Sequence, residues 1–260
     1  DRMVSSGAPL SCRDQISVKI LKNNGYKNVL MTGCPAWYSL NHLNKPFTPP
    51  ERVKNIVFTP PQKPLYHKQS IKILRGLRSI FPKGMIHISF HRGIKSDKYT
   101  PETEEKQIRN LIKNYRRVAG ESIKIHDTSY GVEKIDFYNE CQLHVGYRVH
   151  GHIFFLSVGK PTFLINEDGR GRGVNEVFGL KSIDGWDYTK AGRIRNFLHP
   201  TFFKRFIYKF AEVVKPSKQT EIILNNYISE ELQNNFSSFE KIPEVISQGY
   251  EKMKNMIVSF

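Results

Sequence analysis

The sequence has few cysteines and no long apolar run. Its three cysteines, Cys12, Cys34 and Cys141, are odd in number and show neither a CxxC pair nor metal-ligand spacing. They are typical of free thiols in a reducing compartment, which predicts a cytoplasmic protein. No stretch approaches the roughly 18 continuous apolar residues of a transmembrane helix, and no signal peptide is visible.

Several motifs of common enzyme classes are also missing. The sequence contains no GxxxxGK(S/T), HExxH or GxSxG motif, and no GxGxxG follows a predicted strand. His144, His150 and His152 lie close together in the sequence, but no carboxylate stands at matching helical spacing. We therefore predict no metal site and no bound cofactor.

Acidic residues are scarce relative to basic ones. The 260 residues include 40 Lys and Arg against 24 Asp and Glu, a formal net charge of +16. Such a surface favours anionic partners, either polyanions or anionic membranes. With 39% hydrophobic and 12% aromatic residues, the composition supports a packed core rather than disorder. The length suffices for one large or two small domains.

Strand-like and helix-like patterns alternate along most of the chain. The predicted strands are residues 55–59, 85–90, 123–125, 143–145 and 162–165, and the predicted helices between them are residues 68–81, 101–119 and 131–140. The apolar run 153–158 is too continuous for a surface helix, so we predict a helix buried against the sheet. The alternation predicts an α/β fold with a parallel, doubly wound, Rossmann-like sheet.

Two shorter regions precede this sheet. Residues 1–44 contain a predicted helix over 11–24 and a predicted strand over 27–32, and we expect them to be the remnant of a first Rossmann-like domain. A proline-rich connection over 45–64 follows. It overlaps the start of the second Rossmann-like domain, which we place over residues 55–200.

A helical tail is predicted over residues 201–260. Its first segment is a basic amphipathic helix whose apolar residues, Phe202, Phe203, Phe206, Ile207 and Phe210, lie opposite the basic residues Lys204, Arg205 and Lys209. This segment either contacts an anionic membrane, as a peripheral attachment, or packs back across the two domains.

The candidate site lies between Tyr138 and Leu180. Arg148 and His150 stand just before the predicted buried helix, whose free N–H groups and dipole favour an anionic ligand. In open α/β sheets, ligands bind outside the carboxyl ends of the strands. Arg170 and Arg172 fall in a predicted polar loop, residues 166–173, after the next strand. We therefore predict that these residues converge on one anion pocket.

Further candidates surround this pocket. His152 and Asp168 belong to the same two motifs, and we include them as ligand-binding residues. His91 and Arg92 follow the strand at 85–90, and they either face the same crevice or belong to a solvated loop. Arg13 either reaches the crevice between the domains or, with Asp14, only marks the polar first turn of a helix.

The stretch around Arg148 resembles the C-terminal signature of the polysaccharide pyruvyl transferase family. Arg148–Gly151 matches the family's R-x-H-G motif, and an apolar helix and Gly159–Pro161, a G-x-P motif, follow. Asp168–Arg172 is similar to the D-x-R-x-R version of the next loop. That version usually continues with an acidic residue, whereas Gly173 stands there in this chain.

A second resemblance lies near the start of the sequence. Ser11–Asp14 matches an S-x-R-D motif of the same family, and a helix and a strand follow it. Cys34–Ala36 stands where the family usually has D-P-A. The two matches cover roughly residues 10–40 and 135–185. The resemblance implies two Rossmann-like domains arranged as in the GT-B fold, with the first domain shortened here.

The resemblance also implies an activity. Members of the family transfer pyruvate from phosphoenolpyruvate onto two hydroxyls of a sugar, which forms a cyclic ketal. Arg148 and Arg170 would bind the carboxylate and phosphate of the donor, since Arg presents fork-shaped cationic donors. His150 would be the general acid and base. The acceptor would be a sugar or glycan, free or lipid-linked.

Other classes of function remain open. A GT-B-type glycosyltransferase would use the same Arg and His residues to bind a nucleotide-sugar, with Glu167 or Asp168 near the ribose. A nucleic-acid-binding protein would account for the positive charge, but the aromatic residues sit at core-like spacing rather than between basic residues, which counts against it. An inactive relative of the family is the last alternative.

Overall fold

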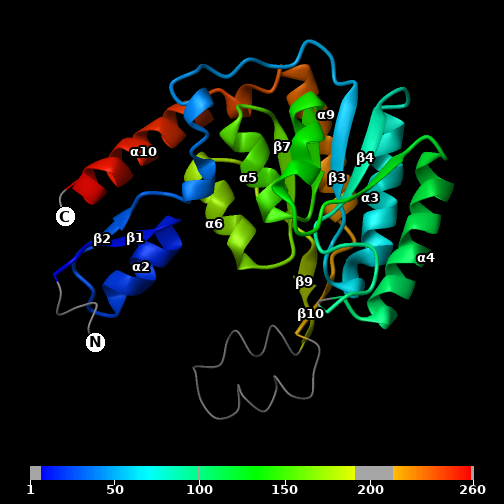
Figure 1. The fold of residues 1–260 in the computed structure, drawn as a ribbon, viewed down its shortest axis with the longest axis horizontal. Coiled ribbons are helices and arrows are strands. Elements are labelled where there is room, and N and C mark those ends of the chain that lie inside the picture. The colour runs from blue at the N-terminus through cyan, green and yellow to red at the C-terminus, as the bar shows by residue number, and fades with distance from the viewer. Residues whose placement is uncertain (1–6, 99, 191–212, 259–260) are drawn as a thin grey trace.

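A six-stranded parallel sheet forms the centre of the protein (Figure 1). The computed structural model describes residues 7–98, 100–190 and 213–258. The sheet strands are β3 (Asn55–Thr59), β4 (Met85–Phe90), β5 (Lys124–Asp127), β6 (Leu143–Gly146), β7 (Thr162–Asn166) and β8 (Ile183–Asp184). Their spatial order is β5-β4-β3-β6-β7-β8, the standard doubly wound order. The predicted α/β fold with a parallel Rossmann-like sheet is confirmed.

Helices cover both faces of this sheet (Figure 1). Neighbouring residues of a strand point to opposite faces, and β3 shows which helix lies on which side. Phe58 packs edge-on against Tyr115 of α4 (Glu102–Ala119). Val57 belongs instead to a buried cluster with Tyr138 and Phe155. Those two residues come from the 3-10 segment η4 (Val132–Glu140) and from α5 (Val149–Ser157).

The remaining sheet-covering helices follow the same division. Helix α3 (His67–Ile80), preceded by η3 (Pro64–Tyr66), packs against α4 and against α9 (Thr220–Gln233). On the other face, α6 (Gly169–Phe178) follows β7. The segment 131–140, expected to be an α-helix, forms 3-10 turns. It has only weak amphipathic character and is anchored mainly through Tyr138, the one fully buried residue of the segment.

An N-terminal unit, residues 10–38, lies beside the sheet (Figure 1). It consists of β1 (Leu10–Cys12), α2 (Gln15–Asn23), β2 (Val29–Met31), parallel to β1, and the 3-10 turn η1 (Pro35–Trp37). The helix predicted over 11–24 thus begins later than expected. Asp14 is the reason, because its carboxylate accepts a hydrogen bond from Ser17 N at 2.7 Å and caps the helix.

The C-terminal helix α10 (Ile242–Val258) returns from the sheet to the N-terminal unit (Figure 1). Tyr250 packs edge-on against Tyr38, with 5.4 Å between ring centroids. Asn44, after the 3-10 turn η2 (Leu40–His42), donates its backbone N–H to Ser247 Oγ at 3.0 Å. A Cβ at Gly249 would lie 2.9 Å from Thr32 O, so the helix touches β2's end directly.

The tail is helical over most of its described length, in α9, the 3-10 turn η5 (Ser237–Phe239) and α10. One part differs from the expectation. Val214–Pro216 forms strand β10, antiparallel to β9 (Trp186–Tyr188). The predicted amphipathic segment 202–210 lies outside the described residues. Among the described helices, none is both long and apolar enough to cross a bilayer.

We predict that the junction between β3 and β6 tolerates no side chain at Gly146. This residue has φ +150°, and a Cβ there would overlap the backbone of Thr59 on the neighbouring strand. Gly146→Ala should lower the free energy of unfolding by about 2–3 kcal/mol, as measured by urea denaturation. Gly169→Ala is the matched control, because no atom lies within 4 Å of its added Cβ. Equal stability of the two variants would contradict this prediction.

Candidate functional site

The candidate site lies at the point where the sheet changes winding direction. Strands β3 and β6 are neighbours. The chain leaves β3 toward β4 on one side, and it leaves β6 toward β7 on the other. Loops diverge there and open a crevice at the carboxyl ends of the strands, where doubly wound proteins bind ligands. Gln62 follows β3, Arg148 follows β6, His91 follows β4 and Glu167 follows β7.

Arg148 is held at the centre of this crevice. Its backbone N–H donates to Thr59 Oγ1 at 3.2 Å, and its Nη1 donates to Gln62 Oε1 at 2.7 Å. Its Nε is buried and has no hydrogen-bond partner among the described residues. Burial lowers the pKa of Arg148; the nearby carboxylate of Glu167 opposes this shift, and the charges of Arg92 and Arg170 add to it. Arginine stays charged despite such shifts, so a largely buried cation lines the pocket at the carboxyl ends of the strands.

Helix α5 begins at this arginine. Arg148 is its N-cap residue and makes no side-chain capping bond, so the N–H groups of the first turn are available for an anion. The helix approaches the sheet closely at Gly151. A Cβ there would lie 2.8 Å from His144 Nε2 and 3.3 Å from Thr59 Cγ2. The glycine therefore lets the N-terminus of α5 reach the strand ends.

His150 lies on the exposed side of the first turn of α5. Partial burial lowers its pKa, and the positive charges of Arg148, Arg170 and Arg13 lower it further. Arg13 comes from the N-terminal unit, so charges from two parts of the fold act on this one histidine. Arg13, Arg92, Arg148, His150 and Arg170 are referred to below as the basic cluster. Of the four residues predicted to converge, the cluster holds Arg148, His150 and Arg170, and the convergence on a bound anion stays a prediction.

Arg170 lies on a helix rather than in the predicted polar loop. Helix α6 begins at Gly169 because Asp168 caps it and accepts a hydrogen bond from Arg170 N at 3.0 Å. The same carboxylate pairs with the guanidinium, through Nε at 3.1 Å and Nη2 at 2.8 Å. Asp168 was expected to contact the ligand, but its carboxylate is occupied by the helix end and by Arg170. It orients that arginine.

Two other predicted ligand contacts are corrected by the structure. His152 is fully buried, and its Nδ1 is hydrogen-bonded with Thr162 Oγ1 at 2.9 Å. Two residues along a helix point to nearly opposite sides, so His152 faces the core when His150 faces the crevice. Arg172 turns away along α6, where its Nε donates to Asp184 Oδ1 at 2.9 Å and its guanidinium covers Trp186.

Glu167 joins the ends of two strands. Its carboxylate accepts the backbone N–H groups of Gln62 and Lys63, each at 3.1 Å, and burial raises its pKa. From the sequence, Glu167 was considered only as a contact to the ribose of a nucleotide-sugar, in the alternative function of a glycosyltransferase. Gln62 was missed altogether, since an isolated Gln after a strand gives no signal. Together these residues fix the loop that positions Arg148.

The N-terminal unit reaches the basic cluster through a contact with α6. Asp14 packs against Gly173, where an added Cβ would lie 3.1 Å from the Asp14 Cγ. Arg13 Nε contacts Asp14 Oδ2 at 3.3 Å. The position where the family resemblance calls for an acidic residue is thus next to a carboxylate supplied by the N-terminal unit.

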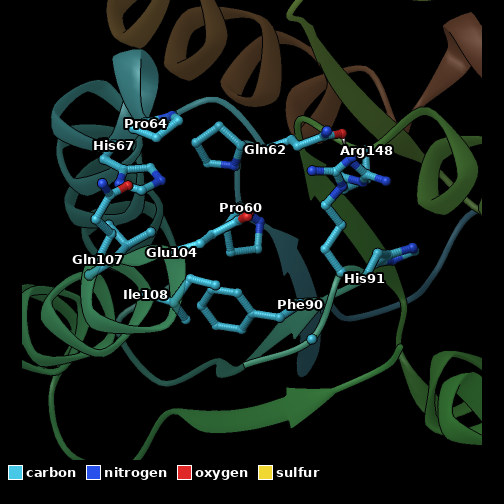
Figure 2. Close-up of a pocket in the computed structure, with 14 residues that line it drawn as sticks. Pro60, Gln62, Pro64, His67, Phe90, His91, Glu104, Gln107, Ile108 and Arg148 are labelled. Atoms are coloured by element: carbon cyan, nitrogen blue, oxygen red, sulfur yellow. Dashed lines mark hydrogen bonds between the residues drawn. The ribbon is translucent and has the colours of Figure 1, made fainter. Parts of the chain in front are cut away.

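A pocket extends from the basic cluster along α4 (Figure 2). Figure 2 shows Arg148 and His91 at one end of this pocket and His67 and Gln107 at the other, with Phe90 between them. Its lining combines apolar residues, among them Phe90 and Ile108, with polar ones that include Gln62 and Glu104. Arg92 and Arg148 belong both to this pocket and to the basic cluster.

Comparison with known proteins gives a family and a fold. A family model described as polysaccharide pyruvyl transferase matches residues 2–169. No curated protein sequence matches the chain significantly. The chain is similar to the solved S. aureus MnaA–UDP co-structure, with a TM-score of 0.52 and 14% identity over 95% of this chain and 57% of MnaA. This likeness shows the fold.

A lower-scoring likeness is to the pneumococcal O-GlcNAc transferase GtfA in complex with UDP and GlcNAc. It has a TM-score of 0.45 and 11% identity over 95% of this chain and 45% of GtfA. The chain therefore spans about half the length of these solved structures.

We predict that the basic cluster controls the protonation of His150. Arg170→Ala removes a nearby positive charge, so the pKa of His150 should rise toward its usual range. Titration of the imidazole proton signals by NMR measures this change. His126 is the internal control, because burial and Lys124 rather than these arginines lower its pKa. An unchanged His150 titration would show that the two residues are not electrostatically coupled.

Proposed function

This chain belongs to the polysaccharide pyruvyl transferase family, whose model matches more than half of its residues, and from this premise we propose its reaction. It transfers a pyruvyl group from phosphoenolpyruvate to two hydroxyls of a sugar or glycan precursor, free or lipid-linked, and forms a cyclic ketal. The reaction needs no further cofactor, because the donor is already activated as an enol phosphate.

The observation that supports this proposal most strongly is the basic cluster at the N-terminus of α5. Phosphoenolpyruvate carries a carboxylate and a phosphate, and guanidinium groups bind both in a forked geometry. Arg148 has a buried, unused Nε donor, and Arg170 is oriented by Asp168. Arg13 contributes from the N-terminal unit. The uncapped helix start adds backbone donors for the phosphate.

His150 is proposed to handle the proton at the enol carbon. In the free protein, burial and three arginines lower its pKa. A bound trianionic donor offsets those positive charges and raises the pKa again, so His150 takes up a proton when the donor binds. The protonated ring can then deliver this proton to C3 of the donor, which makes C2 electrophilic. The arginines stabilise the departing phosphate.

Direct binding of phosphoenolpyruvate tests the site. Arg148→Ala should weaken its binding roughly 10- to 100-fold, because charged hydrogen bonds contribute about 1.5–3 kcal/mol each. Isothermal calorimetry measures this effect. Arg172→Ala is the matched control and should bind like the wild type, since Arg172 pairs with Asp184 outside the basic cluster.

Two outcomes would contradict the proposal. Binding of a nucleotide-sugar without binding of phosphoenolpyruvate would favour a GT-B-type glycosyltransferase. Steeply salt-dependent binding of DNA or RNA alone would favour a nucleic-acid-binding protein.

Replacement of His150 tests the chemical step. His150→Ala should retain donor binding and slow pyruvyl transfer by about 10²- to 10⁴-fold, the usual contribution of a general acid. Wild-type donor binding should also take up a proton, seen as a dependence of the calorimetric heat on the buffer's ionisation enthalpy. That uptake should disappear at a pH above the His150 pKa in the complex. Full activity of His150→Ala would refute the assigned role.

A further inference from the structure

A second histidine lies beneath the basic cluster at the end of a chain of buried hydroxyls. His91 Nε2 is 2.8 Å from Tyr138 OH, and Tyr138 OH is 2.7 Å from Ser89 Oγ. Ser89 Oγ is in turn 2.9 Å from Thr128 Oγ1. Tyr138 and Ser89 are fully buried. These four residues, referred to below as the His91 chain, link the end of β4 to the interior of the sheet.

The direction of these hydrogen bonds fixes the tautomer of His91. Tyr138 donates its only hydroxyl proton to Ser89 Oγ. Its oxygen can then only accept from His91, so His91 must donate through Nε2–H. A neutral imidazole has one N–H and one lone-pair nitrogen, which leaves Nδ1 as the acceptor. Burial raises the pKa of Tyr138 well above its usual range. Tyr138 therefore keeps its proton and acts as a fixed support.

The surroundings of His91 keep it uncharged. Burial, the charge of Arg148 and then His150 lower its pKa to about 3. Arg148 and His91 lie at the same end of the pocket that runs along α4 (Figure 2). His144 on β6, two strands from β4, is buried and neutral and adds no opposing charge. His91 is thus a neutral ring with a defined acceptor nitrogen, next to the proposed donor site.

We propose that His91 is the second catalytic residue, whose Nδ1 accepts the proton of the sugar hydroxyl that attacks the pyruvyl unit. This inference rests on the proposed pyruvyl transfer. One histidine cannot hold a proton for C3 and accept a proton from the hydroxyl at the same moment. The exposed His150 and the half-buried His91 divide these tasks, as paired groups in different environments commonly do.

The proton balance of the reaction fits two residues. His150 gives a proton to C3, the first hydroxyl oxygen bonds to C2, and its proton passes to His91 Nδ1. The C2–O bond to phosphate then breaks, the second hydroxyl oxygen bonds to C2, and its proton leaves with the phosphate. The proton on His91 restores the one that His150 gave up. The products are the ketal and inorganic phosphate, with no oxidant or reductant involved.

His91→Gln separates the hydrogen bond that the ring donates to Tyr138 from the proton that its Nδ1 accepts. The glutamine amide can still donate to Tyr138, but it has no titratable acceptor. We expect phosphoenolpyruvate binding within about threefold of the wild type and pyruvyl transfer slowed by about 10²- to 10⁴-fold. The rate should also lose its decline at low pH. His126→Gln is the matched control, because His126 is a half-buried, stacked histidine outside the site, and it should be unaffected.

The outcomes distinguish this inference from the proposed function. If wild-type protein does not bind phosphoenolpyruvate, the proposed function fails. If it binds and transfers normally but His91→Gln is equally active, only the role of His91 is overturned. Loss of donor binding in His91→Gln would make it a residue that positions Arg148, which also overturns the inference.

The tautomer can be checked without any activity. Nitrogen-15 NMR of the wild type should show His91 as the neutral Nε2–H form down to about pH 4, and Tyr138→Phe should relax this preference. A charged ring or an Nδ1–H form at neutral pH would overturn the assignment of Nδ1 as the acceptor.

Discussion

The site depends on how closely helix α5 approaches the sheet. Gly146 ends β6 and lies against the backbone of Thr59. Gly151, in the first turn of α5, lies against the side chain of the same threonine. Because neither residue carries a Cβ, the uncapped first turn of α5 reaches the carboxyl ends of β3 and β6. The hydrogen bond from the Arg148 backbone N–H to Thr59 Oγ1 holds Arg148 at these strand ends. The arrangement of charge in the crevice therefore follows from backbone packing.

The sheet could be predicted from the sequence because its strands are short and rich in Ile, Val and Phe, residues that favour a pleated and buried strand. Residues 55–59 and 85–90 form strands over the predicted ranges. Helix α6 was missed for a local reason. Gly169–Gly173 has very low helix propensity, yet the cap at Asp168 and the packing of two of its glycines against neighbouring groups outweigh it.

The side chains of the site were harder to predict than its location. Motif spacing located Arg148 and His150, but it does not state which way a side chain points, and His152 turned out to face the core. Arg172 pairs with Asp184, which lies on β8, the strand next to β7. His91 was noticed only as a residue after a strand. Its defining contact is with Tyr138, 47 residues away, which no local pattern reveals.

The absent side chain at position 173 lets helix α6 lie directly against the N-terminal unit. Helix α6 contacts Asp14 directly at Gly173. The separation between α6 and the N-terminal unit at this contact therefore sets how near Arg13 comes to the rest of the basic cluster. A methyl group at Gly173 would act as a spacer. It would weaken the field acting on His150 while every charged residue remained in place. The electrostatic environment of His150 thus depends on a position that carries no side chain.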